Sequence, residues 1–383
     1  MSGKNNARVE HRLAEIASAF LRLGFVAFGG PAAHIALMEA EFVRRRGWLG
    51  REEFLDRLGA VNLLPGPSST EMAIYLGQLR GGVPGLLIAG AAFILPAALM
   101  TLALGWAYVR YGALPQFAGL LWGVKPVVVG LIAQAVWTLA KTALKSRELM
   151  VIAAIVLGLA AMQVSTLALL IGTGVSWIVA NRFGQGKAEF LAAAVAGGSA
   201  TGATAAAGVA TAGVFVYFLK IGALLFGSGY VLLAVLREDL VTRMHWLSET
   251  QLLDAIAVGQ ATPGPFFTVA TFLGYVLSGW SGAALATVGI FVPAFIYVAV
   301  TASVLPRLRK SPTASAFLDG VNAAAVALMA FVGFQFAREA VMTPVAAAIT
   351  AFSGILVFRY RVNSAWLILG GALCGLLVKL AAS

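Results

Sequence analysis

Cations within apolar segments are the residues of this sequence with the most distinctive chemistry. Arg22, Lys125 and Lys220 each lie inside a stretch of otherwise apolar residues. A charge inside a membrane segment costs roughly 2.5–3.5 kcal/mol on insertion scales, so its presence needs a reason. These cations could bind an anionic solute, or their long side chains could extend to the nearby membrane surface. The first explanation predicts an anion-binding site.

Hydroxyl groups follow the motif Pro65-Gly66-Pro67 directly, in the order Ser68, Ser69 and Thr70. A helix that begins after such a break presents free backbone N–H groups and the positive end of its dipole, and both suit an anion. The hydroxyls would add donors to that site, or they could simply cap the helix start. Glu71 comes next. We expect it either to carry a coupling proton or to pair with Arg22 or Lys125.

The broken apolar segments that hold these residues occur twice, since 20–97 recurs as 218–294. Phe28-Gly29-Gly30-Pro31 matches Phe226-Gly227-Ser228-Gly229, and Pro65-Gly66-Pro67 matches Pro263-Gly264-Pro265. Gly and Pro at these points interrupt helices. A repeat built on interrupted membrane helices is typical of secondary transporters, whose site lies where the two halves meet.

The repeat also pairs the candidate site residues. Arg22 matches Lys220, Lys125 matches Asn322, and the amides Asn62 and Gln260 precede the two Pro-Gly-Pro motifs. The second motif is followed by two phenylalanines, so we expect the first copy to make the polar contacts. With Glu71 as the coupling residue, the predicted substrate-binding set is Arg22, Lys220, Lys125, Asn322, Gly29, Gly30, Asn62, Gly66, Ser68, Ser69, Thr70, Gln260, Gly264 and Thr268.

The composition predicts an all-α polytopic membrane protein, because hydrophobic residues make up 60% of the chain and charged residues only 11%. Arg22 interrupts the first apolar run, so we expect no signal peptide. The stretch 189–212 is a weaker candidate for a linking span. Long spans are expected at 84–109, 118–140, 149–162 and 164–181, and at 280–303, 316–336, 342–357 and 364–381.

The positions of the basic residues predict an inverted arrangement of the two repeats. If the opening segments 18–38 and 58–79 each dip into the membrane and return on the same side, most Lys and Arg residues fall in the cytoplasm. A linker that crosses once then inserts the second repeat upside down. The predicted organisation is a first repeat over 1–185, a linker over 186–213 and a second repeat over 214–383, each repeat opening with two broken or re-entrant helices.

The motifs of the two copies resemble those of the chromate transporter family. F-x-x-x-G-x-x-x-F-G-G-P at 20–31, the loop with Trp48-Leu49 and N-L-L-P-G-P at 62–67 carry the resemblance. Q-A-T-P-G-P at 260–265 matches the two-domain, long-chain form of the family. The resemblance implies a multi-pass protein of the bacterial inner membrane that exports chromate and confers chromate resistance, with sulfate as a competing tetrahedral dianion.

Other classes of protein and site are disfavoured. The single Cys374 allows no intramolecular disulfide, and His11, His34 and His245 are too scattered for a metal site. We find no enzyme motif and expect no cofactor. The basic residues lie in short loops, which favours membrane orientation over nucleic-acid binding. Asp254 is expected to cap a helix or pair with a loop arginine. The alternatives are a carrier of sulfate or another oxyanion and an anion channel, and a homodimer stays open.

Overall fold

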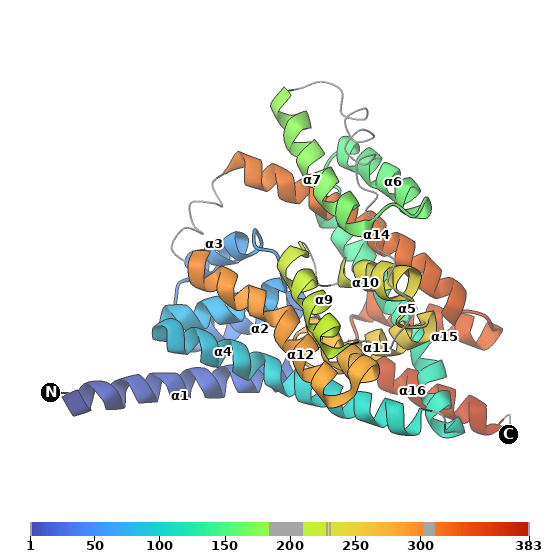
Figure 1. Ribbon diagram of the computed structural model, residues 1–383, viewed down its shortest axis with the longest axis horizontal. Coiled ribbons are helices and arrows are strands. Elements are labelled where there is room, and N and C mark those ends of the chain that lie inside the picture. Colours follow the sequence, from blue (N-terminus) through green and yellow to red (C-terminus); the bar gives the residue numbers. More distant parts are fainter. Residues whose placement is uncertain are drawn as a thin grey trace. The chain divides into compact units, whose positions relative to one another are not determined.

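The computed structural model describes residues 2–112, 114–183, 210–226, 229, 231–301 and 311–381 (Figure 1). Within these ranges the chain forms helices and no strands, which confirms the predicted all-α class. Most of the predicted linker at 186–213 and of the loop at 304–315 lies outside the described residues.

The chain divides into two compact units that each draw on both halves of the sequence. The first unit comprises Met1–Val109, Ala210–Leu224 and Val258–Lys310, and the second comprises Arg110–Val209, Leu225–Ala257 and Ser311–Ser383. The segments of the two repeats are therefore interleaved between the units. The predicted repeat limits at 185 and 214 remain a prediction about the sequence.

The first unit contains the broken segments that open the first repeat. Its core includes the fully buried Phe20, Phe42, Phe54 and Phe93, and α9 packs along α12 (Figure 1). Its helices are α1 (Ser2–Val26), α2 (Pro31–Met38), the π-helix η1 (Glu39–Arg45), α3 (Arg51–Val61), α4 (Ser68–Tyr111), α9 (Thr211–Leu224), the short 3₁₀-helix η3 (Phe266–Thr268) and α12 (Val269–Thr301).

Glycines with positive φ break the helices where the sequence predicts. Gly29 (φ 101) and Gly30 (φ 80) separate α1 from α2, and Gly66 (φ 135) lies between α3 and α4. Gly264 has φ 86 at the equivalent point of the second repeat. Side chains with a Cβ rarely adopt such values, so these positions require glycine.

The helices α4 and α12 each contain a sharp reversal. Gly81 and Gly82 have φ/ψ of −135/16 and 61/−149, and Ser278 and Gly279 have −147/26 and 61/−147. A Cβ on Gly77 would lie 2.4 Å from the carbonyl oxygen of Gly85. Residues this far apart in sequence would be separated by about 12 Å along a straight helix. The chain therefore folds back, and both repeats do so with nearly the same torsions.

The second unit is organised around α14 and α5. Within it α14 packs on α5, α6, α7 and α10, and α5 also packs on α15 and α16 (Figure 1). Glycines allow the closest approach, since a Cβ on Gly123 would lie 2.0 Å from the carbonyl oxygen of Gly371. Its helices are α5 (Pro115–Ala143), α6 (Arg147–Ala161), α7 (Thr166–Phe183), α10 (Val231–Leu236), the π-helix η2 (Arg237–Arg243), α14 (Pro312–Ala340), α15 (Pro344–Tyr360) and α16 (Ser364–Ala381). The helix α11 (Glu249–Ala261) belongs to this unit up to Ala257, and its last residues, from Val258, belong to the first unit.

Several helices are suited to a bilayer. The described part of the chain contains five helices that are long and apolar enough to cross a membrane, and three shorter apolar helices. Each of the eight expected long spans overlaps a helix in the described part of the chain. The five long ones are Ser68–Tyr111, Phe117–Ala143, Phe266–Thr301, Pro312–Ala340 and Ser364–Ala381.

Candidate functional site

The two helix breaks of the first repeat are joined by His34 in the first unit. His34 is 1% exposed and belongs to α2. Its Nε2 lies 3.0 Å from the carbonyl oxygen of Ala27, just before the first break. Its Nδ1 lies 3.2 Å from Oγ of Ser69, in the first turn of α4 after the second break. One imidazole therefore contacts both broken segments.

The Pro-Gly-Pro loop of the second repeat reaches the same place. The backbone N–H of Gly264 donates to the carbonyl oxygen of Ala27 at 2.8 Å. A Cβ on Gly264 would lie 2.8 Å from Cβ of Ala97, and a Cβ on Gly66 would lie 3.9 Å from Cβ of Ala294. Ala97 and Ala294 are repeat equivalents, so each loop packs against the other repeat. The breaks of the two repeats thus meet within this unit.

Buried polar groups without a partner mark the same unit. Oγ1 of Thr70 and Nε2 of Gln260 are buried, and neither has a hydrogen-bond partner in the described part of the chain. Thr70 is 0% and Gln260 8% exposed. An unmet buried polar group costs about 1–3 kcal/mol, which a bound solute could recover. Both atoms can donate, and an anion needs donors.

Glu71 is the most unusual of the predicted residues. It is 0% exposed, and both carboxyl oxygens lack a hydrogen-bond partner among the described residues. A Cβ on Gly66 would lie 2.7 Å from its Oε1, so the carboxyl group rests against the Pro-Gly-Pro loop. A buried carboxyl group needs a hydrogen bond, a cation or a proton. Within the first unit, no hydrogen bond among the described residues joins Glu71 to Arg22.

The remaining predicted residues of the first unit differ in burial. Arg22, Lys220, Asn62 and Gly29 are exposed, whereas Ser68 and Gly30 are half-buried. An exposed cation is accessible to an anion and can also extend to the membrane surface, so the exposure of these two side chains fits both explanations. Thr268 is buried, and its hydroxyl donates to the carbonyl oxygen of Pro265 at 2.8 Å, so this hydroxyl already has a backbone partner.

Lys125 and Asn322 lie in the second unit, where Lys125 forms an ion pair. Its Nζ lies 3.3 Å from Oδ1 of Asp254, and the two side chains are 17% and 3% exposed. Lys125 belongs to α5 and Asp254 to α11. This partner was not anticipated from the sequence. Asn322 is half-buried on α14.

Sequence reasoning missed His34 and the pairing of Asp254. His34 was considered only as a metal ligand, although it lies one turn into the helix that restarts after Gly29-Gly30-Pro31. Ser69 lies in the first turn of the helix that restarts after Pro65-Gly66-Pro67. The available signal was that both residues are polar and lie within about one helical turn of a break.

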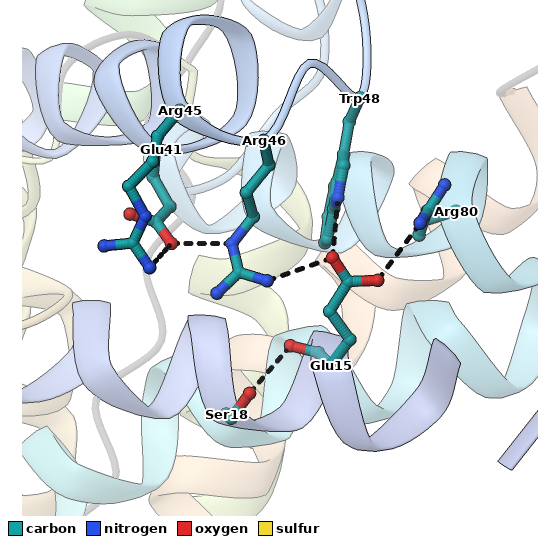
Figure 2. Close-up of polar contacts among 7 residues, drawn as sticks. All are labelled: Glu15, Ser18, Glu41, Arg45, Arg46, Trp48 and Arg80. Atoms are coloured by element: carbon teal, nitrogen blue, oxygen red, sulfur yellow. Dashed lines mark hydrogen bonds and ion pairs between the residues drawn. The ribbon is translucent and has the colours of Figure 1, made fainter. Parts of the chain in front are cut away.

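A charged cluster holds α1 to the segment around η1 (Figure 2). The carboxylate of Glu15 accepts from Arg46 (3.0 Å), Trp48 (3.1 Å) and Arg80 (3.1 Å), and Arg46 also donates to Glu41 at 2.7 Å. Burial acts to raise the pKa of Glu15, but hydrogen bonds from Arg80, Trp48 and Arg46 outweigh it, so the pKa is lowered. The repeat equivalents of Arg46 and Arg80 are Met244 and Leu277. Only the first repeat therefore carries both of these arginines.

These features define a class of protein. Long apolar helices, two interleaved repeats and helix breaks that meet beside buried polar groups are those of a multi-pass membrane transporter. The sequence pattern of the family described as Chromate transporter matches residues 14–178 and again 212–376. The chain belongs to the chromate transporter family and carries two copies of its domain, so it is a transporter and not an enzyme.

Individual relatives align with this chain over most of its length. A chromate transport protein of Cupriavidus metallidurans is 31% identical over 98% of this chain and 95% of the relative. A chromate transport protein of Pseudomonas aeruginosa is 33% identical over 94% of this chain and 91% of the relative. A probable chromate transport protein of Synechococcus elongatus is 30% identical over 84% of this chain and 83% of the relative. No solved structure matches the chain.

Proposed function

We propose that this protein exports chromate across the bacterial inner membrane and thereby confers chromate resistance. Relatives that are named chromate transport proteins align over nearly the whole chain and support the substrate. The observation that carries the proposal is the meeting of broken helices from both repeats at Ala27 and Gly264, in the unit that also contains the unpartnered donors of Thr70 and Gln260.

A tetrahedral dianion must lose its hydration shell to cross a bilayer, and donors must replace the lost water. The N-terminus of α4, which begins at Ser68, supplies backbone N–H groups and a partial positive charge. Thr70 and Gln260 would add side-chain donors to the anion. Because hydrogen-bond donors recognise the charge and shape of a tetrahedral dianion, sulfate is expected to compete with chromate.

The cations of the predicted set would supply charge along the route. Lys125 is balanced by Asp254 in this structure, and we propose that an anion competes with that carboxylate. Arg22 and Lys220 are exposed. Arg22→Ala and Lys220→Ala should abolish chromate transport if these side chains bind the anion. Both variants should transport normally if the side chains only extend to the membrane surface.

Glu71 is the proposed coupling residue. A carboxylate in the first turn of α4 would repel a dianion bound at that helix start. Protonated Glu71 removes this repulsion, so anion binding would be linked to a proton on this side chain. Glu71→Gln mimics the protonated state and should still bind chromate while its transport no longer responds to a pH gradient.

Flux in inverted membrane vesicles tests the proposal. Radiolabelled chromate should accumulate with saturable kinetics, and sulfate should inhibit more strongly than chloride at equal ionic strength. Equal inhibition by sulfate and chloride would contradict a shaped dianion site. Sulfate accumulation without chromate accumulation would favour the sulfate carrier. Flux that does not saturate would favour an anion channel.

A further inference from the structure

The hydrogen bonds of His34 fix which of its nitrogens carries a hydrogen. Nε2 contacts the carbonyl oxygen of Ala27, which can only accept, so Nε2 is the donor. In the neutral imidazole Nδ1 is then an acceptor. The hydroxyl of Ser69, 3.2 Å from Nδ1, must donate to it.

This arrangement withholds the Ser69 hydrogen from an anion. A dianion accepts hydrogen bonds and donates none. With its hydrogen directed to Nδ1, the hydroxyl group of Ser69 presents only lone pairs toward any anion at the start of α4. If Nδ1 is protonated, it donates to Oγ of Ser69, and the hydroxyl hydrogen is free to turn to the anion. Protonation of one nitrogen therefore reverses the direction of the hydrogen bond.

We propose that His34 and Ser69 form a proton-dependent switch of the anion site, in which one proton from solution adds to Nδ1 of His34 when the dianion binds. No covalent bond to the anion forms or breaks, and the added charge partly offsets that of the dianion. The switch rests on the proposed anion transport, and it names His34 as a positioning residue that acts through Ser69.

The surroundings of His34 fit this assignment. The ring meets Phe93 of α4 edge-on, with centroids 5.6 Å apart, and Phe93 cannot titrate. No ion pair joins His34 to an acidic side chain in the part of the chain that the structure describes. Glu71, two residues beyond Ser69 on α4, is the acidic group nearest to Ser69 in sequence, and its carboxyl group rests against Gly66. A dianion would therefore supply the negative charge that favours imidazolium.

The switch also touches the second repeat, but only the first repeat contains it. The Ala27 oxygen that accepts from His34 accepts from the backbone of Gly264 as well. The repeat equivalents of His34 and Ser69 are Leu232 and Phe267, which can form no such hydrogen bond. The polar switch would therefore act from one repeat on a junction that both repeats form.

Proton uptake on anion binding tests the inference. The full-length protein in nanodiscs, in weakly buffered solution with a pH indicator, should take up protons when potassium chromate is added. His34 should contribute a fall in apparent chromate affinity of up to tenfold per pH unit, at pH values between the pKa of His34 in the free protein and its pKa in the chromate-bound protein, because it adds one linked proton. His34→Gln and Ser69→Ala should each reduce this dependence on pH, and Ser69→Thr should restore it.

The comparison between variants removes two ambiguities. Chromate itself takes up protons, but this contribution is the same for every variant, so the difference from the wild-type protein is the readout. Ser69→Ala removes only a hydroxyl group and tests the switch even if His34→Gln does not fold. Glu71→Gln should keep the part of proton uptake that Ser69→Ala removes.

The failure of this inference differs from that of the proposed function. If the wild-type protein neither binds nor transports chromate, the proposed function fails. If it does bind chromate, and Ser69→Ala and a folded His34→Gln both keep the wild-type pH dependence and proton uptake, the switch is wrong. Loss of chromate binding at every pH in Ser69→Ala would also overturn it, since the hydroxyl would then be an ordinary contact.

Discussion

At the scale of single residues, burial separates side chains that the sequence presents as alike. Lys125 and Lys220 are both cations in apolar segments, but Lys125 is largely buried in an ion pair and Lys220 is exposed. A buried cation depends on its partner inside the protein, whereas an exposed one does not. Lys125, which is held in an ion pair with Asp254, is therefore the more informative of the two cations to substitute.

We expect Lys125→Ala to reduce chromate transport at least tenfold, because the variant lacks a cation that can meet the anion. Lys141→Ala is the matched control on the same helix, since Lys141 is exposed and its Nζ lies over the ring of Trp137. The measurement is vesicle flux normalised to the amount of protein in the membrane. Equal transport by the two variants would remove Lys125 from the anion route.

The effects of substituting Lys125 and Asp254 on the stability of the protein should be strongly non-additive. Removing one partner of a buried ion pair leaves an uncompensated charge and typically costs about 3–5 kcal/mol. Lys125→Met and Asp254→Leu should each lower the thermal unfolding temperature in detergent more than the double variant does. Additive effects in this double-mutant cycle would show that the two groups do not interact.

At the scale of elements, glycine sets the helix breaks and their close contacts. Gly264 has a positive φ, and a Cβ there would lie 2.8 Å from Cβ of Ala97. The same loop carries the backbone donor to Ala27. Its geometry therefore holds together the junction of the two repeats.

Gly264→Ala should destabilise the protein by about 1–3 kcal/mol, because it adds backbone strain and a steric clash. Gly158→Ala is the control, since Gly158 lies within α6 and a Cβ there would meet nothing within 4 Å. That change should be neutral or stabilise by up to about 1 kcal/mol. Thermal unfolding of both variants measures the difference, and a neutral Gly264→Ala would contradict the close contact.

The cluster around Glu15 should make the attachment of α1 sensitive to acid. The pKa of Glu15 is lowered in the folded protein, so its contribution to stability is present above the unfolded pKa and is lost as pH falls through the folded pKa. Glu15→Gln should therefore destabilise at neutral pH, and the difference from the wild-type protein should shrink in acid. The exposed Glu10→Gln is the control. A difference that stays constant with pH would contradict the ionic role.

At the scale of the whole molecule, each compact unit combines segments from both repeats. The broken segments of the first repeat share a unit with Val258–Lys310, and α5, α6 and α7 share the other with α14, α15 and α16. Neither repeat forms a unit alone. A change within one unit therefore involves segments of both repeats.

Thiol labelling tests the proposed inverted topology. The loops at 41–57 and 304–315 are predicted to be cytoplasmic and 237–254 external. Arg45→Cys and Arg243→Cys form a matched pair of repeat equivalents, and both side chains are exposed, by 53% and 40%. Cys374 is exposed and is first replaced by Ser. An impermeant reagent on intact cells should label only Arg243→Cys, and labelling of both or neither would contradict inversion.

The sequence by itself determined the membrane class, the duplication and the helix breaks. Gly29-Gly30-Pro31 and Pro65-Gly66-Pro67 predict breaks because Gly and Pro act on their own backbone torsions, independently of distant residues. The long apolar spans follow from local composition in the same way. These features can therefore be predicted from the local sequence without knowledge of the tertiary structure.

Only the tertiary structure decided which side chains meet. His34 and Ser69 are 35 positions apart, and Ala27 receives its bond from Gly264 in the other repeat. Arg22 is exposed and Glu71 is fully buried, although both lie in apolar segments. Contacts and burial depend on how whole helices pack. The apolar pattern of one helix indicates which of its faces is buried, but not which distant residues that face contacts.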